Sequence, residues 1–151
     1  MQGSLTISCD GPGVLGDVTF GDPVSQRFVA SLPYEVAPSA NIVLSQVAQG
    51  MAGGTKPYFT GVAIYNPNPT GVVVTIDVFS EQGDKTGTAA LSLSGGNRIS
   101  RTLPELVPAI TNQARGYIRL TADGGPIVAF ELFGDQTLDF LAAVPPQPIN
   151  P

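Results

Sequence analysis

The sequence of 151 residues contains no histidine, no tryptophan and a single cysteine, Cys9. Without histidine, neither a Ser-His-Asp or Cys-His catalytic arrangement nor a histidine metal ligand can exist. The lone cysteine excludes an intrachain disulfide. Cys9 lies in a predicted strand, so we expect it to be a small buried apolar residue, and a reactive or intermolecular thiol is the alternative.

Charge is also scarce: charged residues make up 13% of the chain, only seven of them are Lys or Arg, and the net charge is −5. An acidic chain of this kind is a poor candidate for binding nucleic acid or an anionic membrane surface. Arg98, Arg101, Arg115 and Arg119 form a modest basic cluster in the sequence. We interpret them as a solvated sheet face whose arginines pair with nearby acids.

Long apolar runs are missing, because none approaches the ~18 residues of a membrane span. We therefore expect no membrane insertion. The first residues lack the basic and apolar regions of a signal peptide. If the parent protein is exported, we expect its signal outside this chain.

Hydrophobic residues, in contrast, make up 42% of the chain, which is enough for a sizeable core. The length predicts one domain, or one and a fraction. The 18 glycines and 14 prolines are together about a fifth of the residues. That share is below the roughly 25–30% of unstructured low-complexity sequence, and many turns between short strands explain it.

The N-terminal segment 3–33 is a second copy of the segment 116–145. From Gly3 to Asp22 the two align without a gap, 113 positions apart. Omitting one residue near Pro23 then brings Phe28 onto Phe140 and Pro33 onto Pro145. Composition alone gives roughly one or two identities over the ungapped length. The identical pairs there are Gly3/Gly116, Asp10/Asp123, Gly11/Gly124, Phe20/Phe133, Gly21/Gly134 and Asp22/Asp135.

This duplication predicts three regions. Residues 1–35 are a partial repeat of three strands, residues 36–145 a complete β-sandwich repeat, and residues 146–151 a proline-rich tail or linker with polyproline II character. A three-stranded piece cannot bury a core alone, because isolated domains below ~40 residues usually need staples. We expect it to pack against something else.

Alternating apolar and polar residues predict strands along most of the chain. One short helix is predicted over 103–110, where Leu103, Leu106, Val107 and Ile110 share a face. Short strands with frequent turns and one helix predict an all-β, antiparallel sandwich. The predicted strands outside the second copy are 4–10, 14–20, 27–34, 42–47, 58–65, 72–79 and 89–94.

Three stretches carry a family resemblance: the run Phe59–Pro67, the segment Arg101–Leu106 and the block Gly116–Gly124. Together with the strand from Val72, they resemble the immunoglobulin-like β-sandwich modules that repeat in large secreted or surface proteins of bacteria. The resemblance covers about residues 58–145 and rests on packing and turn motifs. It implies an extracellular or cell-surface location and a spacer, stalk or adhesive role, with no catalytic residues to carry over.

Several side chains are candidates for a site. Asp10, Asp22, Asp123 and Asp135 recur beside glycines in both copies and are weak calcium candidates, although Asp beside Gly is ordinary turn chemistry. Glu131 lies between Phe130 and Leu132 in an apolar strand, and we expect it to point to solvent rather than to act as a catalytic acid. Four tyrosines could form a sugar-binding face, although cross-strand packing is the commoner role. These are Tyr34, Tyr58, Tyr65 and Tyr117.

The partial repeat is the feature with the clearest functional meaning. An incomplete sandwich leaves open edges and an uncovered apolar face, which attract strands from a neighbour. Head-to-tail pairing of this kind does not close on itself and gives filaments. The alternative is a boundary inside a tandem array, with the segment packed on its own repeat. The residues predicted to mediate assembly are Leu5, Ile7, Val14, Phe20 and Phe28.

We therefore expect a structural or adhesive module that has no enzymatic activity, no cofactor and no small-molecule ligand. Its expected partners are copies of itself or neighbouring repeats. A carbohydrate- or protein-binding sandwich is the alternative, and a hydrolase is the function with least support.

Overall fold

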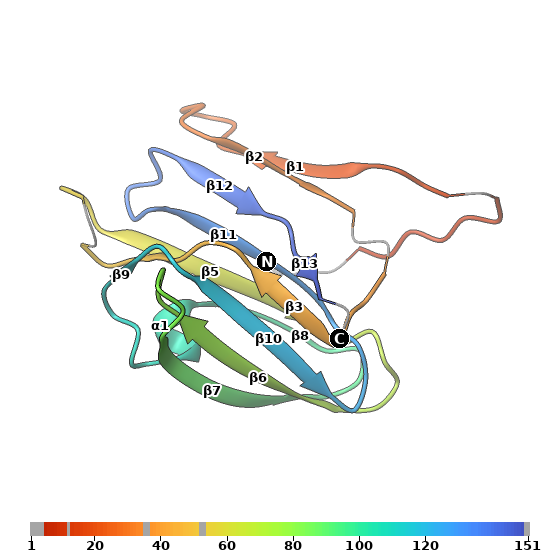
Figure 1. Cartoon of the computed structure of the whole chain (residues 1–151). Helices are drawn as coiled ribbons and strands as arrows, with labels where there is room; N and C mark the ends of the chain where they lie inside the picture. Colours follow the sequence, from red (N-terminus) through yellow and green to blue (C-terminus); the bar gives the residue numbers. More distant parts are fainter. Residues whose placement is uncertain (1–4, 12, 35–36, 52–53, 150–151) are drawn as a thin grey trace.

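The computed structural model describes residues 5–11, 13–34, 37–51 and 54–149 as two packed antiparallel sheets, an N-terminal hairpin and one short helix (Figure 1). This confirms the predicted all-β, antiparallel sandwich. The elements are β1 (Asp17–Gly21), β2 (Val29–Pro33), β3 (Asn41–Leu44), β4 (Ala48–Gln49), β5 (Tyr58–Tyr65), β6 (Val72–Phe79), β7 (Lys85–Leu93), β8 (Arg98–Thr102), α1 (Leu103–Leu106), β9 (Gln113–Ala114), β10 (Tyr117–Asp123), β11 (Val128–Asp135), β12 (Leu141–Val144) and β13 (Gln147–Pro148).

The sandwich has a five-stranded sheet in the order β13-β3-β10-β6-β7 and a four-stranded sheet in the order β12-β11-β5-β8. Two-stranded pairings join β1 to β2 and β4 to β9. The core lies between the two larger sheets because alternate residues of each strand point inward. Its fully buried members include Leu44, Val62, Ile64, Val74, Ile76, Ile118 and Leu120.

The helix α1 closes one end of this core. Leu103, Leu106, Val107 and Ile110 are all buried, as the predicted shared face requires. The helix itself ends at Leu106 rather than at residue 110, and a turn that places Ile110 N–H on the carbonyl of Val107 continues it. Pro108 cannot donate the next helical hydrogen bond, which explains the early end.

The hairpin β1–β2 repeats the hairpin β11–β12 in its register. When the two copies are aligned with the one-residue gap near Pro23, each pair of residues that face each other across β11 and β12 aligns with a pair that face each other across β1 and β2. The pairs are Val18–Leu32, Thr19–Ser31, Phe20–Ala30 and Gly21–Val29 in the first hairpin, and Glu131–Val144, Leu132–Ala143, Phe133–Ala142 and Gly134–Leu141 in the second.

The two hairpin loops are related but differ in length by one residue: the first closes over four residues and the second over three. Gln26 donates its N–H to the carbonyl of Asp22 at 3.1 Å, and Leu138 donates to Asp135 at 3.0 Å. Gln26 and Leu138 both adopt a positive φ, 53° and 55°. The duplication found in the sequence is therefore a duplication of backbone structure over these two strands, with one extra residue in the turn of the first hairpin.

The first predicted strand of the partial repeat is absent from the described residues. Residues 5–10 are exposed and belong to no strand, whereas their counterpart β10 pairs with both β3 and β6. The prediction of a strand here was wrong because a strand needs neighbours, and this chain has no second β3 and β6 for the first copy. Cys9 is accordingly exposed, not buried.

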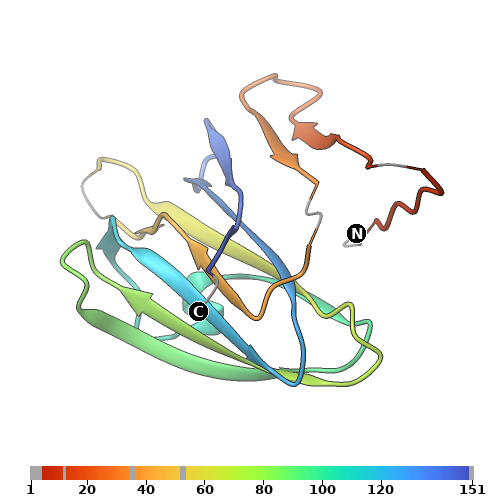
Figure 2. The same ribbon diagram turned by 45° about the vertical axis from the view of Figure 1, so that its right-hand side comes forward.

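The N-terminal hairpin lies outside the sandwich as a further layer next to β12 (Figures 1 and 2). Its strand β2 runs beside β12 but is not paired with it. The proline-rich end, predicted as a stiff spacer, instead forms β13 on β3, and Ile149 donates its N–H to the carbonyl of Asn41 at 2.9 Å. The sandwich therefore includes residues beyond 145.

Candidate functional site

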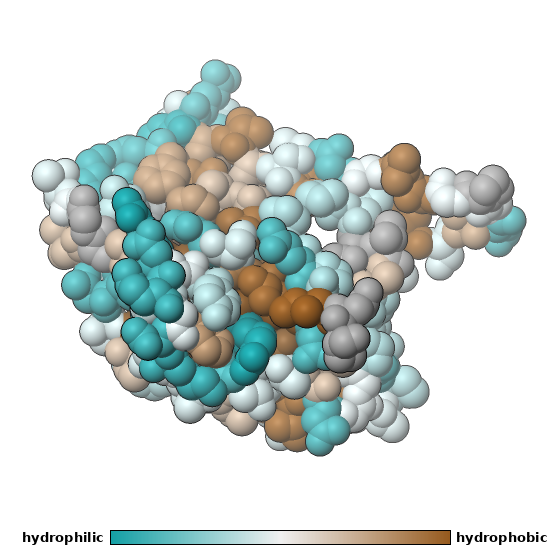
Figure 3. All heavy atoms as spheres, in the orientation of Figure 1, coloured by the Kyte–Doolittle hydropathy of each residue, from teal (hydrophilic) through white to brown (hydrophobic). Residues whose placement is uncertain are grey.

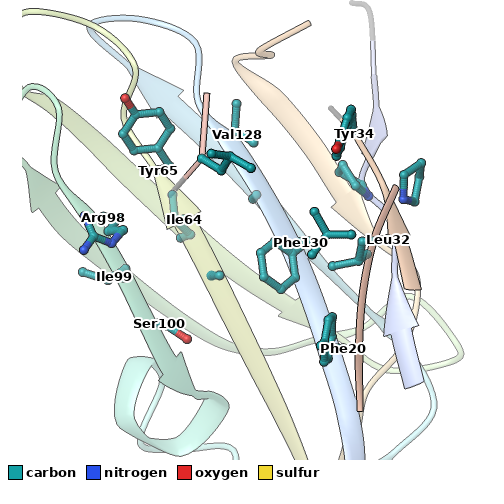
Figure 4. A pocket seen from close by; sticks show the side chains of 16 residues that line it. Phe20, Leu32, Tyr34, Ile64, Tyr65, Arg98, Ile99, Ser100, Val128 and Phe130 are labelled. Carbon is teal, nitrogen blue, oxygen red and sulfur yellow. The ribbon is translucent and has the colours of Figure 1, made fainter. Parts of the chain in front are cut away.

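An apolar groove of about 430 Å³ separates the N-terminal hairpin from the outer face of the four-stranded sheet. Phe20, Leu32 and Tyr34 lie on the hairpin side, and Phe130 lies across from them on β11 (Figure 4). Tyr65, Arg98 and Ser100 line the far end. The groove is the part of the described structure where the two copies of the repeat meet.

The strands of the four-stranded sheet create this groove because both of their faces are apolar. On β5, Val62 and Ile64 point into the sandwich, whereas Ala63 and Tyr65 point outward. The same alternation on β11 directs Val128, Phe130 and Leu132 outward, opposite Tyr65, Ala63 and Gly61. An outer face with this composition needs a cover, and the N-terminal hairpin supplies part of it.

The hairpin itself has one apolar and one polar face. Val18, Phe20, Ala30 and Leu32 share the face that meets the groove, and Ala30 and Leu32 are buried.

On the opposite face, the Asp17 carboxylate accepts hydrogen bonds from Thr19 at 2.8 Å and Ser31 at 2.7 Å. The hydrogen bond from Ser31, followed by that from Thr19, lowers the pKa of Asp17 below its usual value. This polar face is suited to solvent.

The loops of the two hairpins contact each other through Arg27. Its guanidinium donates to the carbonyl of Thr137 at 2.8 Å and lies 3.7 Å from the Asp139 carboxylate. Asp139 is also bound by Lys56, which lies 3.7 Å from Asp135 as well. These contacts hold the two turns side by side.

The four calcium candidates are distributed over separate turns. Asp22 accepts hydrogen bonds from the backbone of Val24 and Ser25, each at 3.0 Å, and from the Ser25 hydroxyl, whose contribution most strongly lowers the pKa of Asp22. Asp135 accepts a hydrogen bond from the backbone of Asp139 at 2.8 Å. Asp10 and Asp123 lie on the exposed surface. Across the described residues, no three Asp, Glu or Cys side chains gather in a way that could hold a metal ion.

Glu131 points into the sandwich, which reverses the expectation that it faces solvent. Its side chain is fully buried, it is paired across the strands with Val62 and Val144, and neither carboxylate oxygen has a hydrogen-bond partner among the described residues. Burial raises the pKa of Glu131 to about 8, and the backbone of Gln46, which lies outside normal hydrogen-bond geometry with the carboxylate, lowers it only in part. The strand alternates as expected, but Glu131 faces the core, and Phe130 and Leu132 face outward. This is the reverse of the expectation, because the hairpin covers the face where Phe130 and Leu132 lie.

The tyrosines do not gather on one face. Tyr34 and Tyr65 line the groove, whereas Tyr117 stacks on Phe79 with ring centroids 4.7 Å apart, and Tyr58 contacts Phe140 at 6.0 Å. Packing therefore accounts for two of the four.

Two of the predicted arginines form the expected pairs with acids. Arg115 lies 3.1 Å from Glu81, and Arg119 lies 3.1 Å from Asp77. Asp77 was not among the predicted site residues. It is buried and also bound by Lys85 at 2.9 Å and by Thr88 at 2.7 Å. Burial acts to raise the pKa of Asp77, but these three donors outweigh it and the pKa falls below its usual value.

The residues predicted to mediate assembly are exposed or partly exposed. Leu5 is 77% exposed, Ile7 48% and Val14 37%. Phe20 and Phe28 are half-buried, and Phe20 lines the groove. The groove itself was not predicted, because Phe130 on its other wall was expected to face inward, opposite to Glu131.

Comparison with known proteins places the chain by its fold. No family model matches the sequence, and no curated protein matches it. A solved structure, "Crystal Structure of Thermotoga maritima 1070", is similar with a TM-score of 0.58 and 11% sequence identity, over 76% of this chain and 97% of that chain. At this identity the likeness shows a mostly-β antiparallel fold alone. No described helix has the length and apolar character needed to cross a membrane.

Proposed function

We propose that this chain is a non-enzymatic structural module of an extracellular repeat protein, which associates with other repeats through its N-terminal segment. The observation that carries this proposal is the distribution of exposed apolar side chains. Seven of the twelve exposed large hydrophobic residues in the described part lie between Leu5 and Val29. They are Leu5, Ile7, Val14, Leu15, Val18, Val24 and Val29. Several lie on the segment that projects ahead of β1 (Figure 3).

The second copy indicates what normally covers such residues. Ile118 and Leu120, the counterparts of Leu5 and Ile7, are fully buried on β10 between β3 and β6. At about 25 cal/mol for each Å² of apolar surface, leaving such side chains in water is unfavourable compared with covering them by a neighbouring repeat. A repeat partner is therefore the simplest way to bury the N-terminal segment.

The strand pairing supports a relation to immunoglobulin-like modules, with a difference at the edges. The pairs β5–β8 and β6–β10 correspond to the pairs B–E and C–F of an immunoglobulin sandwich. The neighbouring strands at the edges differ. In this chain β3 lies against β10, where the immunoglobulin fold places strand G against F. Likewise β11 lies against β5, where that fold places strand A against B. A repeat spacer of surface proteins suits this arrangement, since it needs stable sheets and exposed edges rather than a catalytic cleft.

Light scattering on the purified chain tests this proposal. The unmodified protein is expected to show a mass that rises with concentration, and Ile7→Ser is expected to reduce that rise. Val73→Ser is the matched control, because Val73 is exposed to a similar extent, 46%, but lies on β6 outside the N-terminal segment. A strictly monomeric unmodified chain at high concentration would remove the assembly function.

The groove favours a second candidate, a carbohydrate- or protein-binding module. Tyr34, Tyr65, Phe20 and Phe130 line it together, and aromatic side chains of this kind stack on sugars and anchor peptides. Glycan-array screening of the unmodified chain and of Tyr65→Ala tests this candidate. Binding that Tyr65→Ala abolishes supports it, and an array without hits speaks against the carbohydrate version.

A further inference from the structure

The hairpins of the two copies match in strand geometry. They share one register and a positive φ at Gln26 and Leu138, and the turn of the first hairpin is one residue longer. Each hairpin also needs a glycine at the same place. A Cβ on Gly21 would lie 2.8 Å from the carbonyl oxygen of Phe28, and one on Gly134 would lie 2.6 Å from that of Phe140. Residues 17–33 therefore have the backbone shape that β11 and β12 have.

The side chains of the first copy also suit the interior of the sandwich. With the exception of one charged residue, the residues of the second copy that point into the core are apolar and have apolar counterparts, although Ala129 is matched by the smaller Gly16. The matched pairs are Leu5/Ile118, Ile7/Leu120, Cys9/Ala122, Phe20/Phe133, Ala30/Ala142 and Leu32/Val144.

The exception is Glu131, whose counterpart is Val18. Glu131 places two carboxylate oxygens without hydrogen-bond partners in the core, and an unpartnered buried polar group is unfavourable. Val18 in the same position would face Val62 with apolar surface only. At this position the first copy fits the core better than the copy that occupies it.

The outer faces differ in the complementary way. Phe130 and Leu132 make the outer face of β11 apolar, and the N-terminal hairpin partly covers it. The counterparts of these residues are Asp17 and Thr19, which are exposed and hydrogen-bonded to each other at 2.8 Å. A sandwich completed by the first copy would have a more polar outer face at these two positions.

We propose that residues 5–33 of one chain occupy, in a second copy of this chain, the place that β10, β11 and β12 hold in the structure described here. This inference rests on the proposed function and specifies its partner, its location and its register. Residues 5–10 then form a strand between β3 and β6 of the second copy, and β1 pairs with its β5. The exchanged form releases residues 116–145 of that copy, and a covalent bond can trap it even when it is a minor species.

Native Cys9 provides the trap. Ala122 is paired with Val74 on β6, so Cys9 of one chain would face position 74 of the other. In the variant Val74→Cys, mild oxidation is expected to yield a disulfide-linked dimer, and peptide mapping is expected to find the bond between Cys9 and Cys at position 74. Val72→Cys is the matched control, because Val72 is equally buried on the same face of β6 but is not paired with β10. It is expected to give no such bond.

A second set of variants keeps the inference testable if Val74→Cys does not fold. Glu131→Val removes the energetic advantage that Val18 has over Glu131 in the core. Strand exchange between differently labelled chains, measured by energy transfer between the labels, is therefore expected to slow about tenfold. Val18→Glu is expected to act in the same direction. Thr19→Glu, on the solvent-facing side of the same strand, is expected to leave the rate unchanged.

Each outcome distinguishes the inference from the proposed function. A bond between Cys9 and position 74 in dimers supports both. The same bond within a monomer overturns exchange with a second copy, because residues 5–33 would then enter their own sandwich. A third outcome is that the chain associates with rising concentration, that no such bond forms, and that Glu131→Val exchanges at the unmodified rate. This outcome overturns the inference and leaves the proposed function standing. Absence of any association overturns both.

Discussion

The hairpins β1–β2 and β11–β12 have the same strand register and different surroundings. One lies outside the sandwich with Val18 46% exposed, and the other lies within it with Glu131 fully buried at the matching position. The apolar residue is thus the one in contact with water, and the acid is the one in the core. The comparison teaches that turn and register follow from the local sequence, whereas the burial of a side chain follows from what the rest of the molecule places beside it.

The outer faces extend the comparison. Asp17, Thr19 and Ser31 form a hydrogen-bonded polar surface on the first hairpin, while Phe130, Leu132 and Ala143 form an apolar one on the second. The two hairpins match in register and share an apolar face except at Val18 and Glu131, so their different layers go with the different polarity of their outer faces. Three experiments test this contrast.

The largest expected effect concerns the protonation of Glu131. Its pKa is about 8 in the folded protein and near the ordinary 4.5 in the unfolded chain, so the folded state binds more protons between these values. The free energy of unfolding should therefore fall as the pH rises through this window, by about 1.4 kcal/mol for each pH unit. Urea titrations followed by circular dichroism between pH 4.5 and 8 measure this slope.

Other groups with shifted pKa values do not titrate within this pH window. The pKa of Asp77 is lowered from 3.8, and that of Lys56 is raised from 10.5, so both titrate outside it. Below the window, acids with a lowered pKa lose their stabilising contribution, which should place the stability maximum near pH 4.5. Glu131→Gln is expected to abolish the slope. An unmodified protein equally stable at pH 5 and pH 8 would contradict the burial of Glu131.

The next effect compares the two matched glycines. Gly134→Val should destabilise the protein by about 3 kcal/mol, because its side chain would meet the backbone of Phe140 inside a central sheet. Gly21→Val meets Phe28 in the same way, but its hairpin lies outside the core. It should change the free energy of global unfolding by less than about 0.5 kcal/mol. Chemical unfolding of the two variants measures the difference, and equal losses would show that β1–β2 folds as part of the core.

The smallest effect concerns the contact between the two turns. Arg27→Ala removes the hydrogen bond to the carbonyl of Thr137 and the ion pair with Asp139. Amide hydrogen exchange in β1 and β2 should accelerate, while exchange in β5 and β10 stays unchanged. Arg115→Ala is the control, because it breaks an exposed ion pair with Glu81 on the sandwich and should leave β1 and β2 unaffected. Unaltered exchange in β1 and β2 of Arg27→Ala would show that this contact does not hold the hairpin.

Much of the fold could be predicted from local signals. The strands β5 and β6 and the buried face of α1 follow from apolar periodicity, and the duplication predicted the β1–β2 hairpin. The strand β8 was missed, because Arg98–Thr102 carries more polar than apolar residues and lies at a sheet edge. The pairing of β13 with β3 was missed as well, because Pro148 is unusual in a strand and is tolerated here only because β13 lies at the edge of its sheet.

The candidate site was less predictable. Phe20 was identified as an assembly residue and lines the groove, but the other wall was assigned to the core. In an alternating strand the apolar residues normally indicate the buried face. That rule is ambiguous for β11, because Phe130 and Glu131 are both shielded from water, each by a different layer.

The amino-acid sequence is enough to predict the hairpins, since a glycine beside an aspartate and alternating side chains act over a few residues. It also determined the duplication, the absence of histidine chemistry and the all-β class. Only the tertiary structure decided that Glu131 faces the core, that residues 5–10 are not a strand and that a groove lies under the N-terminal hairpin. These features depend on which surface covers which, and burial is a property of neighbours distant in the chain.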